Sequence, residues 1–216
     1  MARLATISVT TSLITTLRAQ ILDGVVEPGR GLAENDVAAE FEVSRPTARV
    51  AITQLVHEGL LRRAGRQQPA RVPRLTAADV EDLFLVRMPL ELEAVRLVAG
   101  DSAAHERAAR AVDDLHAVGD AQRPSVFVEA DLCFHRALVD GVGSPRMSKF
   151  YELLSGEIHL SMLQSRLALG RDRIAAEHGA ILDALREGAV ELAGERMHAH
   201  LDGARRAMLA TLVDDS

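Results

Sequence analysis

The sequence contains a single cysteine, Cys133, among its 216 residues. One cysteine excludes an intramolecular disulfide and any zinc site that depends on several cysteines, and it fits a reducing compartment. Long apolar runs are also missing, because none approaches the roughly 20 residues that a membrane-spanning helix needs. The first residues lack the charged-then-apolar pattern of a secretory signal. We therefore expect a cytoplasmic protein with no membrane partner.

Positive charge is scarce overall, since the formal net charge is −6, but it is unevenly distributed. Residues 1–74 carry a net charge of +3 and residues 75–216 a net charge of −9. Between Val43 and Arg74, seven arginines are accompanied by one acidic residue, Glu58. This asymmetry predicts two domains, a basic one over 1–74 and an acidic one over 75–216, with a basic contact surface on the first.

The first domain has the order of elements of a winged helix-turn-helix. Apolar spacing predicts helices over 8–24, 33–41 and 44–59, the last with Ser44 as its N-cap. A short basic segment over 60–73 is broken by glycine and proline, as is typical of a two-stranded wing.

The third of these helices carries the residues that we expect to read DNA. Arg45 and Arg49 fall one turn apart on a face that is separate from the apolar stripe of the helix. The first turns of a recognition helix present such side chains to the major groove, where arginine can bond a guanine edge or a phosphate. We therefore predict binding to double-stranded DNA; the alternative is a solvated basic face.

From Thr76 onward, helical periodicity replaces the turn signals. Helices are predicted near 76–99, 102–118, 125–141, 145–168, 171–187 and 189–212. The predicted fold class is therefore mainly α, with an N-terminal winged helix-turn-helix and a C-terminal all-α antiparallel bundle of about six helices. Pro89 falls inside the first helix of the bundle and should kink it.

Three helices of the bundle place titratable side chains on otherwise apolar stripes. These residues are Asp131, His135, His178 and His200. Burial of such groups without partners is costly, and one divalent metal ion would satisfy all four. We expect zinc, nickel or manganese; the alternative is a set of separately hydrogen-bonded core histidines. His198, about 200° around the helix from His200, is assigned to solvent.

Residues 17–61 resemble the GntR-type winged-helix regulators. The family carries I-x-x-G-x-x-x-P-G, L-x-E-x-x-[LV]-A and V-S-R-x-x-x-R stretches, matched by Ile21, Gly24, Pro28-Gly29, Leu32, Glu34, Val37-Ala38, Val43-Ser44-Arg45 and Arg49. The resemblance implies DNA contacts by Arg45, Thr47 and Arg49, with assistance from Arg66 in the wing. Val50 departs from the polar residue that is usual at its position.

Residues 79–209 are similar to the FCD-type ligand-binding domain of the FadR-like branch, and six helices suit its VanR-like subgroup. The branch shares D-x-x-x-H, a later E-H, a final inward histidine and an opening R-x-x-L-E, matched by Asp131, His135, Glu177-His178, His200, Arg87, Leu90 and Glu91. The resemblance implies a metal that helps to hold a small carboxylate effector, with Arg87 as its counter-charge. The alternative for Arg87 is a surface ion pair.

We therefore expect a homodimeric transcription regulator, a repressor, that binds a pseudo-palindromic operator and responds to a small organic acid. Two alternatives remain. The metal itself could be the signal, or a site of three histidines and an aspartate could activate water in an enzyme. No further catalytic base lies on an inward stripe, so enzymatic activity is not expected.

Overall fold

The computed structural model describes residues 8–65, 68–119 and 121–214, and the chain divides into two compact units, 1–74 and 75–216. Both units are mainly α-helical, which confirms the predicted fold class. None of the helices in the described part of the chain has the combination of length and hydropathy that a bilayer span requires. Each unit has its own buried core and is described by itself.

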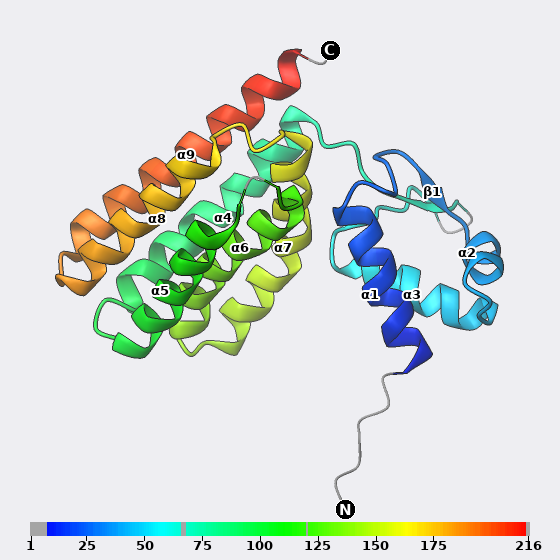
Figure 1. Cartoon of the computed structure of the whole chain (residues 1–216), viewed down its shortest axis with the longest axis horizontal. Helices are drawn as coiled ribbons and strands as arrows, with labels where there is room; N and C mark the ends of the chain where they lie inside the picture. Colours follow the sequence, from blue (N-terminus) through cyan, green and yellow to red (C-terminus); the bar gives the residue numbers. More distant parts are fainter. Residues whose placement is uncertain (1–7, 66–67, 120, 215–216) are drawn as a thin grey trace, which may run out of the picture. The chain divides into compact units, whose positions relative to one another are not determined.

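Unit 1 is built on three helices, α1 (Val9–Leu22), α2 (Glu34–Glu40) and α3 (Arg45–His57). Both α1 and α2 pack against α3 (Figure 1). The Ser44 hydroxyl accepts a hydrogen bond from the Thr47 backbone N–H at 3.2 Å, which caps α3 as its sequence predicts. Ser8 caps α1 in the same way through Thr11, so the first and third helices both begin at a serine.

The wing differs from the sequence prediction in its strand pairing. β2 (Ala70–Arg71) pairs antiparallel with β1 (Gly31–Leu32), which lies in the loop before α2, and an isolated bridge joins Arg62 to Arg71. The loop returns to the wing at Gly29, whose φ of +89° suits glycine and whose N–H donates to the Val72 carbonyl at 2.7 Å. A pairing between segments so far apart in the chain leaves no local signal in the sequence.

Unit 2 is an antiparallel bundle, whose described part contains six helices (Figure 1). Their bounds are α4 (Ala77–Leu97), α5 (Ser102–Ala117), α6 (Pro124–Gly141), α7 (Pro145–Gln164), α8 (Arg171–Arg186) and α9 (Val190–Asp214). Helix α4 packs against α6, α7 and α9, while α8 packs against α5, α6 and α9. The inward faces of α4, α6, α8 and α9 therefore enclose the middle of the bundle.

Helix α4 continues through Pro89 rather than ending there. Proline removes one hydrogen bond from the helix, that of the carbonyl four residues earlier, which belongs to Leu85. Both Leu85 and Pro89 lie on the exposed side of α4, so water can bond this carbonyl. A capping box between Thr76 and Asp79 fixes the start of the helix.

Candidate DNA-binding surface and metal centre

Helix α3 buries one face and presents another to solvent. Ala48, Ala51, Ile52 and Leu55 have no exposed surface and join the core of unit 1. The side chains of Arg45 and Arg49 remain 60% and 57% exposed, on the face that the sequence predicted. The apolar stripe therefore fixes the rotation of the helix about its axis and turns both arginines outward.

A carboxylate from the neighbouring helix contacts both arginines. Glu34, the first residue of α2, accepts hydrogen bonds from Arg49 Nε at 3.0 Å and from Arg45 Nε at 3.4 Å. Burial would raise the pKa of Glu34, but the two guanidinium groups, Arg49 foremost, reverse this and lower it. Both bonds use Nε, and both side chains are more than half exposed, so the terminal Nη groups can reach an acceptor in solution.

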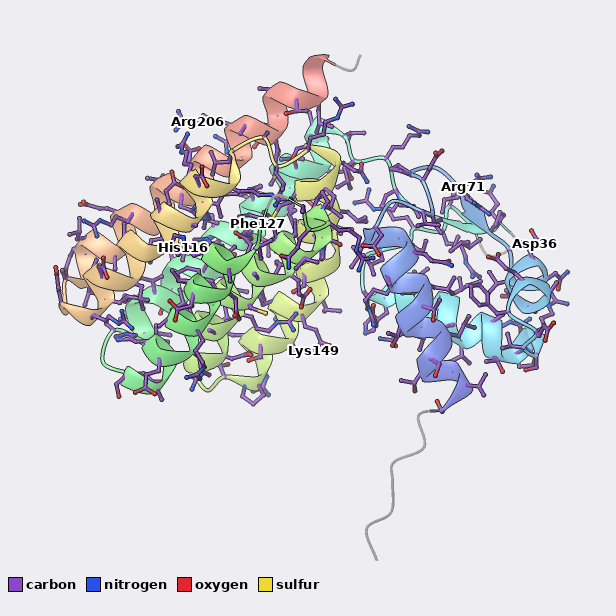
Figure 2. All side chains as sticks on the ribbon, in the orientation of Figure 1. Asp36, Arg71, His116, Phe127, Lys149 and Arg206 are labelled. Carbon is purple, nitrogen blue, oxygen red and sulfur yellow. The ribbon has the colours of Figure 1, made fainter. Side chains whose placement is uncertain are left out.

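A groove with a volume of about 1010 Å³ extends from these arginines to the wing. Its lining includes Thr53 of α3, Asn35 of α2 and Arg63 and Gln68 of the wing. Thr47 lies at the start of α3, with its hydroxyl 2.8 Å from that of Ser44. Arg71 is an exposed residue of the wing (Figure 2), and its Nη1 donates to the Gly29 carbonyl at 3.0 Å. Arg66, expected to assist from the wing, lies outside the described residues.

In unit 2, the four residues of the expected metal site come together at the centre of the bundle. Asp131, His135, His178 and His200 are at most 3% exposed. One ligand atom from each lies within 4.8 Å of the others. The Nε2 atom of His178 is 3.1 Å from that of His135 and 3.2 Å from that of His200, and it is 3.5 Å from Asp131 Oδ1. Helices α6, α8 and α9 thus direct their polar groups at one point.

Two further carboxylates orient two of the histidines from behind. His200 Nδ1 donates to Glu177 Oε2 at 2.8 Å, and His135 Nδ1 contacts Glu91 Oε2. A carboxylate can only accept, so the proton of each ring sits on Nδ1 and the lone pair on Nε2. The third ring, that of His178, is stacked on Phe134 with centroids 4.1 Å apart.

This arrangement fits a divalent cation. The Nε2 lone pairs of His135 and His200 both point at Nε2 of His178 and repel one another. Nε2 of His178 can carry only one proton, which would hydrogen-bond to one of the two lone pairs and leave the other without a partner. Metal–nitrogen bonds of about 2.0–2.1 Å place neighbouring ligand nitrogens about 2.8–3.0 Å apart at octahedral angles and about 3.3–3.4 Å apart at tetrahedral angles, and the observed separations of 3.1 and 3.2 Å lie between these values. Burial lowers the pKa of His178 well below its usual value and also lowers that of His200, so both rings are held in the neutral form that binds metal.

Arg87 lies in the interior beside this cluster and not on the surface. Its Nε donates to Glu91 Oε1 at 2.5 Å, and the side chains are 2% and 1% exposed. Burial alone would raise the pKa of Glu91, but the charge of Arg87, together with the contact from the His135 ring, reverses this and lowers it to about 2. The alternative interpretation of Arg87 as part of a surface ion pair is therefore wrong, because the pair with Glu91 is buried.

Arg87, Asp131 and His200 also line a pocket of about 20 Å³. That volume holds about one water molecule. The pocket places a buried cationic side chain next to two of the candidate metal ligands. His198, which shares α9 with His200, is exposed, as the sequence predicted.

Three contacts at these sites were not predicted from the sequence. Glu34, Glu91 and Glu177 were singled out only as positions in motifs. The spacing of Arg87 and Glu91, one helical turn apart on α4, was the one local signal for their ion pair. The contacts of Glu91 with His135 and of Glu177 with His200 join different helices and depend on the packing of the bundle.

Two matches to known families together cover most of the chain. Residues 10–68 match the bacterial regulatory proteins of the gntR family, and residues 82–203 match the FCD domain. The first match contains the recognition helix and its arginines. The second contains Arg87, Glu91 and the four residues of the buried cluster.

Individual relatives agree with these matches along most of their length. The HTH-type transcriptional regulator YdhC of Bacillus subtilis (strain 168) is 28% identical over 86% of this chain and 84% of its own. A probable D-xylose utilization operon transcriptional repressor of Paenarthrobacter nicotinovorans is 26% identical over 84% of this chain and 80% of its own. The crystal structure of a GntR regulator from Rhodococcus sp. RHA1 has a TM-score of 0.78 at 27% identity, covering 93% of this chain and 97% of that one.

Proposed function

The chain belongs to the GntR family of bacterial transcriptional regulators and carries an FCD domain, and from this premise we propose that it is a homodimeric repressor controlled by a small carboxylate that binds beside a divalent metal. Its relatives are DNA-binding regulators and not enzymes, so the metal-dependent enzyme considered above is set aside. The observation that carries the proposal is the position of Arg87, a buried cation in a pocket shared with Asp131 and His200.

DNA binding is assigned to the exposed face of α3. Arg45, Thr47 and Arg49 are proposed to contact the operator, with help from Arg66, and the exposure of both α3 arginines supports this. Two heads related by a twofold axis would read a pseudo-palindromic site. Repression is supported by the name of the Paenarthrobacter relative, which is called a transcriptional repressor.

The metal is proposed to bind Asp131, His135, His178 and His200. Its support is the convergence of three imidazole Nε2 atoms and a carboxylate in a buried site. When bound, the ion would supply positive charge that attracts an acidic effector. Glu91 and Glu177 would keep the protons of two rings on Nδ1, away from the ion.

The carboxylate effector is proposed to bond the Nη groups of Arg87. Since Glu91 already takes Nε, the guanidinium can bridge the two acids through different nitrogens. An effector that favours a DNA-incompetent arrangement must itself bind more weakly when operator is present, by the same factor.

The test begins with selection of a binding sequence from random duplex DNA by the full chain. Affinity for that sequence is then measured with zinc, nickel or manganese added or chelated, and with a panel of carboxylic acids. We expect tight metal retention and release of DNA only when an acid is added. Release on changing metal alone would replace the acid by the metal as the signal, and enrichment of no sequence would reject DNA regulation.

Two variants of α9 separate the metal site from its surroundings. His200→Ala should lose metal, as measured by elemental analysis of the purified protein, and should lose the response to acids. His198→Ala makes the same substitution at an exposed position two residues away. This variant should retain both its metal and its response to acids. Equal metal content in the two variants would contradict the proposed ligand set.

A further inference from the structure

The pocket beside the buried cluster has charged groups at one end and hydrocarbon elsewhere. Its charged end is formed by Arg87, Asp131 and His200. The rest of its wall is mostly apolar and includes Met162, Leu167, Leu169, Ile174, Ala204 and Met208. A ligand held by its carboxylate at Arg87 would therefore extend its remaining atoms against hydrocarbon.

The apolar wall offers little to a polar ligand. Its one side-chain hydroxyl, that of Ser165, donates to the Met162 carbonyl at 3.1 Å, which leaves only its oxygen as an acceptor for a ligand. A ligand hydroxyl placed against this wall would lose its bonds to water without gaining equivalent ones, which costs affinity. A second carboxylate would lose still more, because a charge would be buried without a counter-charge.

We propose that the effector is a short aliphatic monocarboxylate, bound with its carboxylate at Arg87 and its hydrocarbon tail against Met162, Leu169 and Met208. This inference rests on the proposed function, since it names the chemical class of acid that the site accepts. The apolar wall would then select against polyhydroxylated acids and dicarboxylates, although both could place a carboxylate at the charged end equally well.

The pocket must enlarge to admit such a tail, because its 20 Å³ holds about one water molecule. Two methionines in the wall can adapt by changing rotamer, since the side chain is unbranched and flexible. The connection between α7 and α8 covers the pocket with Leu167, Ala168 and Leu169. Arg166 and Leu167 both have a φ of +53°, a conformation disfavoured for side chains with a Cβ, so this covering segment stores local strain that a change of conformation could release.

The proposal predicts a graded dependence of affinity on chain length. Each added methylene that is buried should tighten binding about fourfold until the pocket is filled. Each hydroxyl placed on the tail should weaken binding about tenfold.

The experiment is calorimetric titration of the full chain, saturated in turn with zinc, nickel and manganese. The ligands are acetate, propionate, butyrate, pentanoate, gluconate and succinate. Two variants are titrated in parallel. Met208→Gln makes the tail end of the pocket polar at constant length, whereas Met147→Gln makes the same change at a partly buried methionine of α7 that does not line the pocket.

We expect affinity to rise from acetate to pentanoate, with gluconate and succinate weaker than butyrate. The rise should flatten in Met208→Gln and persist in Met147→Gln. Tightest binding of gluconate or succinate, or a chain-length dependence that Met208→Gln leaves unchanged, would overturn the selectivity while leaving carboxylate sensing intact. Binding of none of the six acids would reject carboxylate sensing itself.

Discussion

The substitution Glu91→Gln tests how much the buried carboxylate on α4 contributes to the stability of the bundle. Glu91 accepts from Arg87 at 2.5 Å, and both side chains are almost completely buried. Glutamine keeps the size of the side chain and one carbonyl acceptor but removes the negative charge. Loss of one partner from a buried ion pair lowers the free energy of unfolding by about 3–5 kcal/mol. Because the glutamine carbonyl can still accept from Arg87, we expect a loss near the lower end, about 3 kcal/mol.

Helix α4 provides a matched control for the same substitution. Glu93 accepts from Arg96 at 2.6 and 2.8 Å, but the two side chains are 47% and 61% exposed. Solvent screens such a pair, so Glu93→Gln should unfold at the same urea concentration as the wild type. Burial, and not the presence of an ion pair, is then the cause of any difference.

Urea unfolding can be followed in the bundle alone through tyrosine fluorescence. Tyr151 is the only tyrosine in the sequence, which has no tryptophan, and it lies buried in α7. Metal is chelated during the measurement, so that metal binding does not contribute to the result. A loss of about 3 kcal/mol should lower the urea midpoint by about 1–3 M, because each molar of urea lowers the free energy of unfolding by about 1–3 kcal/mol.

A double substitution gives the stricter form of this test. Arg87→Met combined with Glu91→Leu removes both charges and should recover most of the stability that Glu91→Gln loses, since apolar residues of similar volume can replace a buried pair. If Glu91→Gln were as stable as the wild type, or if Glu93→Gln lost as much, the reasoning from burial would be refuted.

Three further predictions concern other parts of the chain. Arg49→Ala should weaken binding to the selected DNA sequence about fivefold or more in fluorescence anisotropy, because a recognition arginine contributes about 1–3 kcal/mol; unchanged affinity would remove Arg49 from the interface. Glu34→Gln should lower the ratio of specific to non-specific affinity by releasing the recognition arginines, whereas Asp36→Asn, an equal change of charge at an exposed residue of α2, should not (Figure 2). Partial desolvation, aided by the Glu129 charge, raises the pKa of the exposed Cys133, so its thiolate fraction at pH 8 is below that of an ordinary thiol. Iodoacetamide should modify Cys133 more slowly in the folded protein than in the unfolded protein, as measured by mass spectrometry. Equal rates in the two states would contradict this reasoning.

Much of the fold follows from local signals in the sequence. Ser44 and Thr76 mark helix starts because their hydroxyls cap the first turn, and apolar periodicity gives the face that each helix buries. The largest difference in a helix end is in α7, because the helix predicted to reach residue 168 ends at Gln164. Arg166 and Leu167 adopt a left-handed conformation, which their side chains do not predict.

The sites were less accessible to sequence reasoning because they depend on packing between helices. Asp131 and His135 share a helix face, so their proximity could be read from their spacing. That the ring of His200 meets that of His178 depends on how α8 and α9 pack. The contact of Glu34 with two arginines of α3 likewise needs the angle between α2 and α3, for which the sequence has no periodic signal.

The start of α4 has a practical consequence for protein engineering. Thr76 and Asp79 cap this helix reciprocally, and the Leu75 N–H donates to Gln164 Oε1 at 3.0 Å, so both anchors of its first turn belong to unit 2. A chimaera joined between Arg74 and Leu75 would keep these anchors with the bundle and exchange the DNA-binding head as one piece. The same bundle could then be attached to heads of different sequence preference, which would yield reporters for one acid at several promoters.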